Sequence, residues 1–194
     1  MSSTRAQLRR HPERAVPDEI AAILEQGLVA HVGFTIEGQP FVIPLLYHVE
    51  STAPEHLYLH GAKASRAMRQ LATGIPVSIA VTLVDGIVYS RNARNHSMNY
   101  RSVVGFGTAH SIVDASAKAA IFERMTQRYI ADRTVERDYA APSSNDLNTV
   151  EVVEVVIEEW SAKARRGGPT GPQDDNPDAP GTAGVIAVRQ SFQP

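Results

Sequence analysis

The sequence predicts a mainly β fold, an antiparallel closed or split β-barrel of about six or seven strands with helices at its ends. Two pairs of β-rich runs are each joined by a two-residue turn signal, at Glu37-Gly38 and at Asp85-Gly86, which is the spacing of a tight hairpin. Helical segments are inserted between the strands and do not alternate with them one for one, which disfavours a doubly wound parallel sheet. Of the 194 residues, 43% are apolar and 21% are charged, which suits one domain with its tails.

The first half of the chain is predicted to form a helix, a hairpin, a third strand and a second helix. Pro17 followed by two acidic residues is typical of a first helical turn, and Gly27 ends that helix. The third strand breaks at Gly61, where a basic segment leads into the second helix. The expected ranges are 17–27 for the first helix, 28–36, 39–49 and 56–60 for the strands, and 63–73 for the second helix.

The second half is predicted to contain a second hairpin, a long strand, a third helix and a last strand. Pro76 precedes the hairpin, and a polar connection follows it. Ile121, Phe122 and Met125 recur at helical spacing and indicate the apolar stripe of the third helix. The expected ranges are 77–84, 87–91, 101–113 and 150–162 for the strands and 115–130 for the helix.

Composition divides the chain into a domain over residues 1–165 and a tail over 166–194. Proline, glycine, aspartate and asparagine dominate the tail, so it has too few apolar residues to offset the entropy of ordering. We expect it to be mobile or to lie over a neighbouring subunit. The apolar residues 185–188 are an exception, and we expect them to dock as an edge strand on this subunit or on a partner.

Charge and cysteine usage exclude several classes of function. A net charge of −2 argues against a general nucleic-acid-binding protein, and the absence of cysteine excludes disulfides, thiolate metal sites and a cysteine nucleophile. The seven histidines show no spacing typical of a metal site, so we expect none. No apolar run resembles a signal peptide or a membrane span, so we expect a cytoplasmic protein that does not contact a membrane.

The segment after the third predicted strand has the features of an anion site. Gly61 permits close approach of a ligand to the backbone, and free N–H groups at a helix start near Lys63 would favour an anion. Ser65 and Arg66 add a hydroxyl donor and a planar guanidinium suited to phosphate. In the alternative interpretation, Ser65 only caps the helix and Arg66 is solvated.

A second polar motif occupies residues 91–101, where arginine, histidine and asparagine are dense on one connection. Loops of this composition often carry function. In the alternative interpretation, Arg91 and Arg94 are solvated, the asparagines serve turn geometry, and Tyr100 has its ring in the core.

Together these motifs resemble the pyridoxamine 5′-phosphate oxidase-like superfamily, in the branch related to nitroimidazole-resistance proteins. The resemblance covers roughly residues 8–165 and depends on segments 9–14, 38–47, 58–62, 65–66 and 96–107. It implies an FMN-binding split barrel that forms a homodimer, with the flavin in a groove between the two subunits.

The resemblance also implies which residues contact the flavin. Strand 41–45 would lie along the isoalloxazine ring, and the segment from His60 to Arg66 would surround the phosphate. Tyr100 and Arg101 would reach the flavin or the partner, and Trp160 would stack on the ring, although a lone tryptophan is more often part of a core. The implied cofactor-binding residues are Val42, Ile43, Pro44, Leu45, His60, Gly61, Lys63, Ser65, Arg66, Tyr100, Arg101 and Trp160.

By the same resemblance, the chain is expected to be a flavin-dependent oxidoreductase that transfers hydride at flavin N5 to or from a small molecule, with a nicotinamide donor or oxygen. His48, His96 and Tyr100 are the candidates for proton delivery, and His96 is favoured because it lies in the polar motif. The residues after Trp160 depart from the proline- and arginine-rich end of the vitamin B6 oxidases, so the substrate stays open. The alternatives are a non-catalytic flavin carrier or sensor, FAD or a deazaflavin in place of FMN, and a haem-binding barrel with His60 or His96 as axial ligand.

Overall fold

A computed structural model describes residues 5–50 and 52–190 of the chain. Its seven strands are β1 (Val29–Ile36), β2 (Gln39–Glu50), β3 (Ala53–Ala62), β4 (Pro76–Tyr89), β5 (Ser97–Ser111), β6 (Val150–Arg165) and β7 (Gly184–Ala187). Its α-helices are α1 (Ile20–Gln26), α2 (Arg66–Leu71), α3 (Ala115–Tyr129) and α4 (Ser144–Thr149), and short 3-10 turns lie at Pro12–Arg14, Pro17–Glu19 and Ala93–Asn95.

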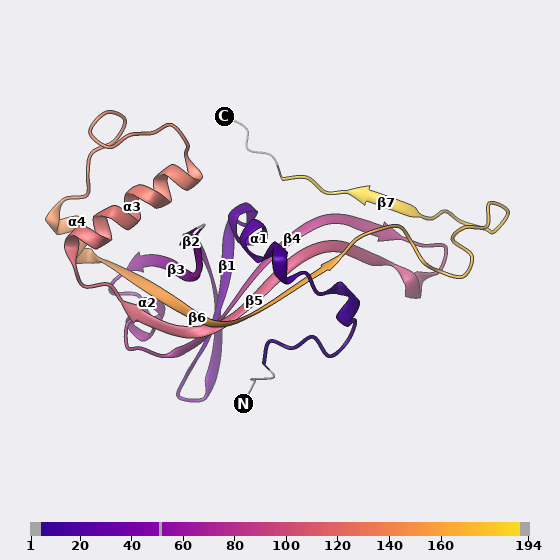
Figure 1. Ribbon diagram of the computed structural model, residues 1–194, viewed down its shortest axis with the longest axis horizontal. Helices are drawn as coiled ribbons and strands as arrows, with labels where there is room; N and C mark the ends of the chain where they lie inside the picture. The colour runs from indigo at the N-terminus through magenta and orange to yellow at the C-terminus, as the bar shows by residue number, and fades with distance from the viewer. Residues whose placement is uncertain (1–4, 51, 191–194) are drawn as a thin grey trace.

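The seven strands form one antiparallel sheet in the order β1-β2-β3-β6-β5-β4-β7, and an additional β1–β4 pairing closes the first six into a ring (Figure 1). The predicted mainly β split barrel is therefore confirmed. The predicted Glu37-Gly38 hairpin is also present, and both turn residues have positive φ, 49° and 82°. These values belong to the turn type whose twist matches that of the flanking strands.

The ring is split between β2 and β3. These two strands pair only over the last residues of β2, with Tyr47 opposite Leu59, while β3 continues its pairing with β6 as far as Ala62 opposite Val150. In the described part of the chain, residues 41–46 therefore pair with β1 on one edge and with no strand on the other. This free edge is where the flavin was expected.

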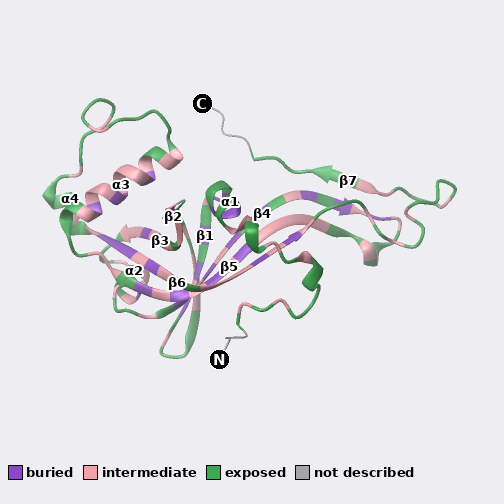
Figure 2. Ribbon diagram, in the orientation of Figure 1, coloured by how far each residue is buried: buried purple, intermediate pink, exposed green. Residues whose placement is uncertain are grey.

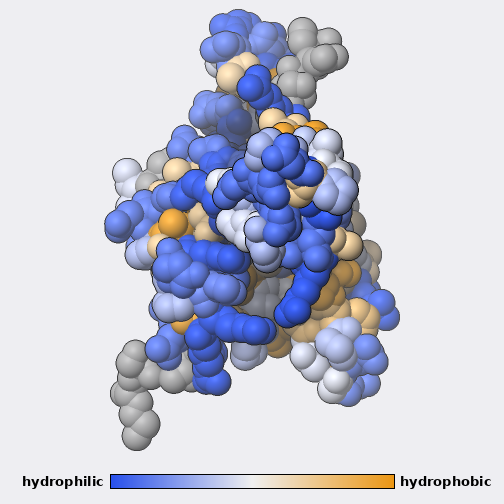
Figure 3. Space-filling model, turned by 90° about the vertical axis from the view of Figure 1, so that its right-hand side faces the viewer, coloured by the Kyte–Doolittle hydropathy of each residue, from blue (hydrophilic) through white to orange (hydrophobic). Residues whose placement is uncertain are grey.

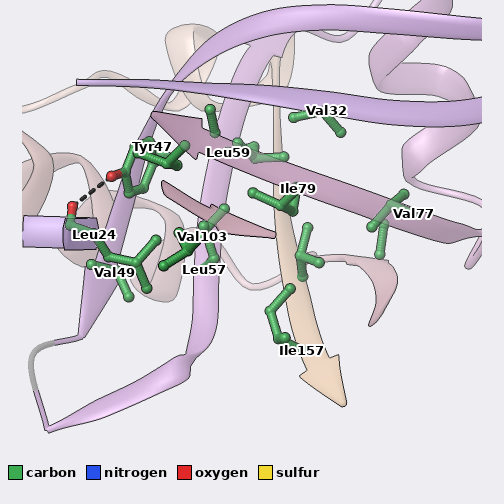
Figure 4. Close-up of a cluster of buried hydrophobic side chains, with 14 of the residues drawn as sticks. Leu24, Val32, Tyr47, Val49, Leu57, Leu59, Val77, Ile79, Val103 and Ile157 are labelled. Atoms are coloured by element: carbon green, nitrogen blue, oxygen red, sulfur yellow. Dashed lines mark hydrogen bonds between the residues drawn. The ribbon is translucent and has the colours of Figure 1, made fainter. Parts of the chain in front are cut away.

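The core lies inside the ring, because alternate residues of each strand point inward. Leu57, Leu59 and Ile79 are fully buried there, and each contributes about 1.5–3 kcal/mol by leaving water (Figure 4). Tyr47 closes one end of the core by donating a 2.5 Å hydrogen bond to the carbonyl of Leu24 at the end of α1.

Helix α3 covers the outer face of β3 and β6. It begins at the N-cap Asp114, whose carboxylate accepts the N–H of Ala117, and its range matches the prediction within one residue. Ile121 and Met125 pack with Val152 in a second apolar cluster outside the ring. Buried residues lie mainly along the strands and this helix face, and the segment after β6 is largely exposed (Figure 2).

The predicted hairpin at Asp85-Gly86 is wrong. Strand β4 continues through both residues with only a bulge after Val84, and the chain reverses later, between Tyr89 and Ser97. Asp85 is held in the strand by two hydrogen bonds from Arg101, and Gly86 lies against β7, where a side chain would meet the carbonyl of Ile186 at 3.0 Å. Long-range contacts therefore override the local turn signal.

Strands β4 and β5 extend beyond the ring as an arm, to which β7 adds a third strand (Figure 1). The tail is attached to this arm. Asp174 accepts hydrogen bonds from Ser90 Oγ at 2.8 Å and from the N–H of Arg91 at 2.9 Å, and the Arg91 guanidinium donates to the carbonyls of Ala179 and Gly181. Arg91 of the 91–101 motif therefore holds the chain's own tail.

Candidate functional site

The segment between β3 and α2 has a mixed structural role. The Ser65 hydroxyl caps α2 by accepting the N–H of Met68 at 3.2 Å, as in the alternative interpretation. A side chain at Gly61 would lie 2.9 Å from Met68, so this glycine makes room for packing of α2. Helix α2 spans six residues and is shorter than the predicted 63–73, which limits any dipole contribution to anion binding.

The two cations of this segment lie beside β2. The Arg66 guanidinium is 4.6 Å from the centroid of the Phe41 ring, a cation–π contact that joins the segment to the first residues of the free β2 edge. Lys63 and Arg66 are exposed, and neither has an acidic partner among residues 5–50 and 52–190. Their charge is therefore available to an anion.

Strand β2 presents an apolar stripe on its outer face, opposite to the face that carries Phe41. Val42 is 64% exposed and Leu46 is 48% exposed, with Pro44 between them on the same face, while Ile43 and Leu45 pack toward the core. Because proline cannot donate to a ladder, Pro44 fits a strand whose outer edge is unpaired. The free edge of β2 lies between the stripe and the cation over Phe41, so a ligand with a flat apolar ring and a phosphate would lie along this edge to meet both.

The stripe is part of a larger exposed apolar surface. It continues across β1, where Val29 lies opposite Leu46, and along the arm to Val84, Ile87 and Ile186. An apolar surface spread over several strands is typical of a protein interface.

His60 lies on the other side of the sheet from Gly61 and Met68, because successive strand residues face opposite sides. Its ring packs against Phe122 of α3, with the centroids 5.1 Å apart, and its Nδ1 is buried with no hydrogen-bond partner in the described part of the chain. Burial lowers the pKa of His60, so its imidazole is neutral at neutral pH.

Tyr100, Arg101 and His96 lie on or near the arm. Arg101 forms a bidentate pair with Asp85, at 2.7 and 2.9 Å, and these hydrogen bonds lower the pKa of the Asp85 carboxyl. Tyr100 points to the opposite face, that of Val84, and lies 5.9 Å from the Lys163 ammonium. The Nδ1 atom of His96 accepts the N–H of Ser90 at 3.1 Å, so the proton of its neutral ring is on Nε2.

The arm residues are remote from the cationic segment of the same chain. Ala62 pairs with Val150 at the start of β6, and Tyr100 pairs with Arg165 at its end. Fifteen residues of strand separate these positions, which corresponds to roughly 50 Å. One chain therefore does not bring Tyr100, Arg101 or His96 to the site beside Phe41.

Trp160 packs against the core. Its ring lies across Gly105, where an added Cβ would be 2.5 Å from the indole, and within the described residues its buried N–H has no hydrogen-bond partner.

Among the residues described, no group of three histidine, cysteine or acidic side chains is arranged to hold a metal ion. None of the helices in this part of the chain has the length and apolar character that a membrane span requires.

Sequence reasoning missed Phe41 and Phe122 as partners of site residues. Phe41 was predicted only as a member of the strand expected along the flavin ring, and Phe122 only as part of an apolar helix stripe. Their contacts with Arg66 and His60 join elements far apart in the chain, and no local pattern signals such contacts.

A protein-family model described as pyridoxamine 5′-phosphate oxidase matches residues 17–164. The chain belongs to this family. The match covers the split barrel from the first helix to the end of β6 and confirms the resemblance inferred from the motifs. A search of curated proteins found no match.

Several solved structures share this fold. The flavocytochrome Anf3 from Azotobacter vinelandii is 30% identical, with a TM-score of 0.83 over 99% of this chain and 87% of that chain. The FAD and haem binding protein from Mycobacterium smegmatis is 28% identical, with a TM-score of 0.82 over 93% of this chain and 85% of that chain. A 5-nitroimidazole antibiotic resistance protein from Bacteroides thetaiotaomicron, at 22% identity, has a TM-score of 0.63 over 90% of this chain and 88% of that chain.

Proposed function

We propose that this chain is a flavin-dependent oxidoreductase that binds FMN beside β2 and acts on a small molecule. The observation that carries the proposal is the contact of Arg66 with Phe41, which joins an unpaired cation to the free apolar edge of the split barrel. Two similar proteins, named a flavocytochrome and an FAD and haem binding protein, support a flavin as the ligand.

The cationic segment would hold the flavin phosphate. Arg66 can donate two parallel hydrogen bonds to phosphate oxygens, and Lys63 adds a second positive charge. Each hydrogen bond to a charged group is worth about 1.5–3 kcal/mol. Ser65 has a smaller share in the proposal, because its hydroxyl oxygen already caps α2.

The free edge of β2 over residues 42–46 would lie along the ring system of the flavin, and the exposed side chains of Val42, Pro44 and Leu46 would exclude water from one side of it. A bound flavin accepts or donates hydride at N5, and the protein supplies position and electrostatics. The phosphate and ring ends of the site thus come from different elements, the segment before α2 and strand β2.

A homodimer is part of the proposal. The apolar surface on β1, β2 and the arm gives two copies a face to bury, and a two-fold axis would place the same surface of each copy against the other. The arm then offers a route by which one subunit reaches the flavin of its partner. Tyr100, which lies on the apolar face of the arm, is the arm residue that we assign to this role.

Proton delivery would also come from the partner. His96 carries its proton on Nε2, and Tyr100 has a hydroxyl, so both can donate. Within one chain they are roughly 50 Å of strand from the cationic segment, so only an intersubunit site can use them.

Haem binding is a second candidate, favoured by the names of the two similar proteins and by the environment of His60. An axial ligand needs a neutral imidazole with a free nitrogen lone pair, and the burial that lowers the pKa of His60 keeps its ring neutral. His96 fits less well, because Nδ1 accepts a backbone N–H and Nε2 is protonated. Loss of a haem absorption band in His60→Ala but not in His96→Ala would support this assignment.

The proposed function is tested by absorption spectroscopy of the purified protein during titration with FMN, followed by NADPH without oxygen. Uptake of FMN and bleaching of its band are the expected results for a reductase. If the protein takes up FMN but NADPH does not bleach the flavin band and no turnover with oxygen is seen, a carrier or sensor is favoured. Absence of FMN uptake would contradict the proposal.

A further inference from the structure

A groove with an excess of positive charge lies at the far end of β6, away from the site beside Phe41. It has a volume of about 620 Å³ and is formed by the N-terminal segment, the tip of the arm and the start of the tail. Its charged and titratable lining residues are Arg14, Arg94, Arg165, Arg166, His96 and Glu13. The molecule seen from the arm end is predominantly hydrophilic (Figure 3).

Among the residues that the structure describes, no carboxylate neutralises the charge of Arg165. Its guanidinium donates to the side-chain oxygen of Asn99 at 2.5 Å and to the carbonyls of Gly167 and Gly168 at 3.4 and 3.1 Å. All three acceptors are neutral, so the full positive charge remains beside the groove while the guanidinium is fixed in place.

The other arginines add to this excess. Arg94 is exposed, and within the described residues its side chain has no hydrogen-bond or ion-pair partner. The Arg14 Nε atom is 4.0 Å from the Glu13 carboxylate, which is closer, at 2.9 Å, to His11. Arg166 has a close carboxylate, that of Glu19.

The rest of the lining also suits an anion. The Nε2 atom of His96 carries the proton of the neutral ring, because Nδ1 accepts the N–H of Ser90. Gly167 has a φ of 108°, and neither it nor Gly168 would bring an added Cβ within 4 Å of another group, so this wall is open backbone. The whole chain has a net charge of −2, so the positive charge here is a local feature.

We propose that this groove binds a phosphate group of an anionic ligand. Planar guanidinium groups match phosphate oxygens in pairs, and a doubly charged phosphate gains more from several cations than a carboxylate does. The proposal does not depend on flavin binding. Three sources share this chemistry: the pyrophosphate of FAD, a phosphate of a nicotinamide nucleotide, and a phosphorylated small substrate.

The test is isothermal titration of the full-length protein with inorganic pyrophosphate, using Arg94→Ala, Arg94→Lys and Arg189→Ala. Arg94 and Arg189 are both exposed and their changes remove the same charge, but only Arg94 lines the groove. We expect about tenfold weaker binding for Arg94→Ala, less weakening for Arg94→Lys and none for Arg189→Ala. Equal affinity of wild type and Arg94→Ala, or no binding of pyrophosphate by wild type, would overturn the proposal.

Further titrations of Arg94→Ala separate the three sources. Weaker binding of FAD with unchanged FMN affinity would identify the pyrophosphate of FAD, and a raised KM for NADPH but not for NADH would identify the phosphate of the donor. Loss of pyrophosphate binding with neither change would identify a separate phosphorylated substrate. Failure of wild type to bind FMN would contradict the proposed function and leave the pyrophosphate result as an independent test of the groove.

Discussion

Ser65 and Arg66 are adjacent in the sequence and have different roles in the structure. Ser65 completes the start of α2, whereas Arg66 lies over Phe41 and keeps its charge free. The cationic character of this segment could be predicted, because it depends only on which residues are present. The role of Gly61 could not, because it depends on the position of Met68 in the folded chain.

His48 and His60 make the stability of the fold depend on pH. Burial is the main cause that lowers the pKa of each ring below its ordinary 6.5, although Glu50 opposes this effect at His48. At pH values between the pKa of the folded state and 6.5, these histidines bind more protons in the unfolded chain than in the folded one. The free energy of unfolding is therefore highest above pH 6.5 and declines as the pH falls below it. We expect the free energy of unfolding to fall between pH 7 and pH 5.

Urea denaturation at pH 7, 6 and 5 checks this expectation in wild type and in a His48→Gln, His60→Gln double variant. The variant is expected to lose part of the decrease, because its glutamines do not titrate. Carboxylates with lowered pKa, such as Asp85, act only below about pH 4 and leave this window unchanged. The same decrease in both proteins would assign the effect to other groups.

At the scale of elements, most strands and the third helix could be predicted from periodicity and capping. The Asp85-Gly86 turn was wrong because the same dipeptide also fits a bulge, and its partner Arg101 lies 16 residues further along the chain. Strand β3 was predicted too short and α4 was missed, since neither has a strong apolar period at its ends.

The packing of β5 on β6 predicts a strict requirement for glycine at residue 105. An alanine there would place its Cβ 2.5 Å from the Trp160 ring, so we expect Gly105→Ala to destabilise the fold by about 1–3 kcal/mol and to change the tryptophan emission. Gly168→Ala is the matched control, because a Cβ there has open space, and it should stay within about 0.5 kcal/mol of wild type. Equal stability of both variants by thermal unfolding would contradict this packing.

The attachment of the tail to the arm predicts a local effect of Asp174. Its carboxylate accepts from Ser90, Arg91 and Gly171, so Asp174→Ala should raise hydrogen exchange and proteolysis of residues 166–183 with little change in the melting of the barrel. Asp175→Ala removes the same charge from an exposed neighbour. Identical cleavage rates for the two variants would show that Asp174 does not hold the tail.

At the scale of the whole molecule, the split barrel could be predicted because hairpins and inserted helices restrict the possible sheets. The arm and its exposed apolar face could not be predicted, since they depend on how far β4 and β5 extend past the ring. Likewise, the family resemblance implied that Tyr100 and Arg101 reach the flavin or the partner subunit, while the register puts them at the opposite end of β6 from Ala62.

The dimer proposal predicts that a charge on the apolar face separates the subunits. Leu46→Asp changes a half-exposed side chain, so the single chain should still fold, while light scattering should report a monomer and flavin binding should weaken. Val113→Asp is the control, because Val113 is 86% exposed in the connection between β5 and α3. A wild-type monomer, or a Leu46→Asp dimer that retains its flavin, would contradict an intersubunit site.

The most direct test of the account compares the affinities of FMN and riboflavin for wild type and for Arg66→Ala, because riboflavin lacks only the phosphate. If Arg66 holds the phosphate, wild type prefers FMN by about 10- to 100-fold, as expected for a charge-assisted contact, and Arg66→Ala loses most of that preference. An equal preference for FMN in both proteins would place the phosphate elsewhere and contradict the assignment of the site.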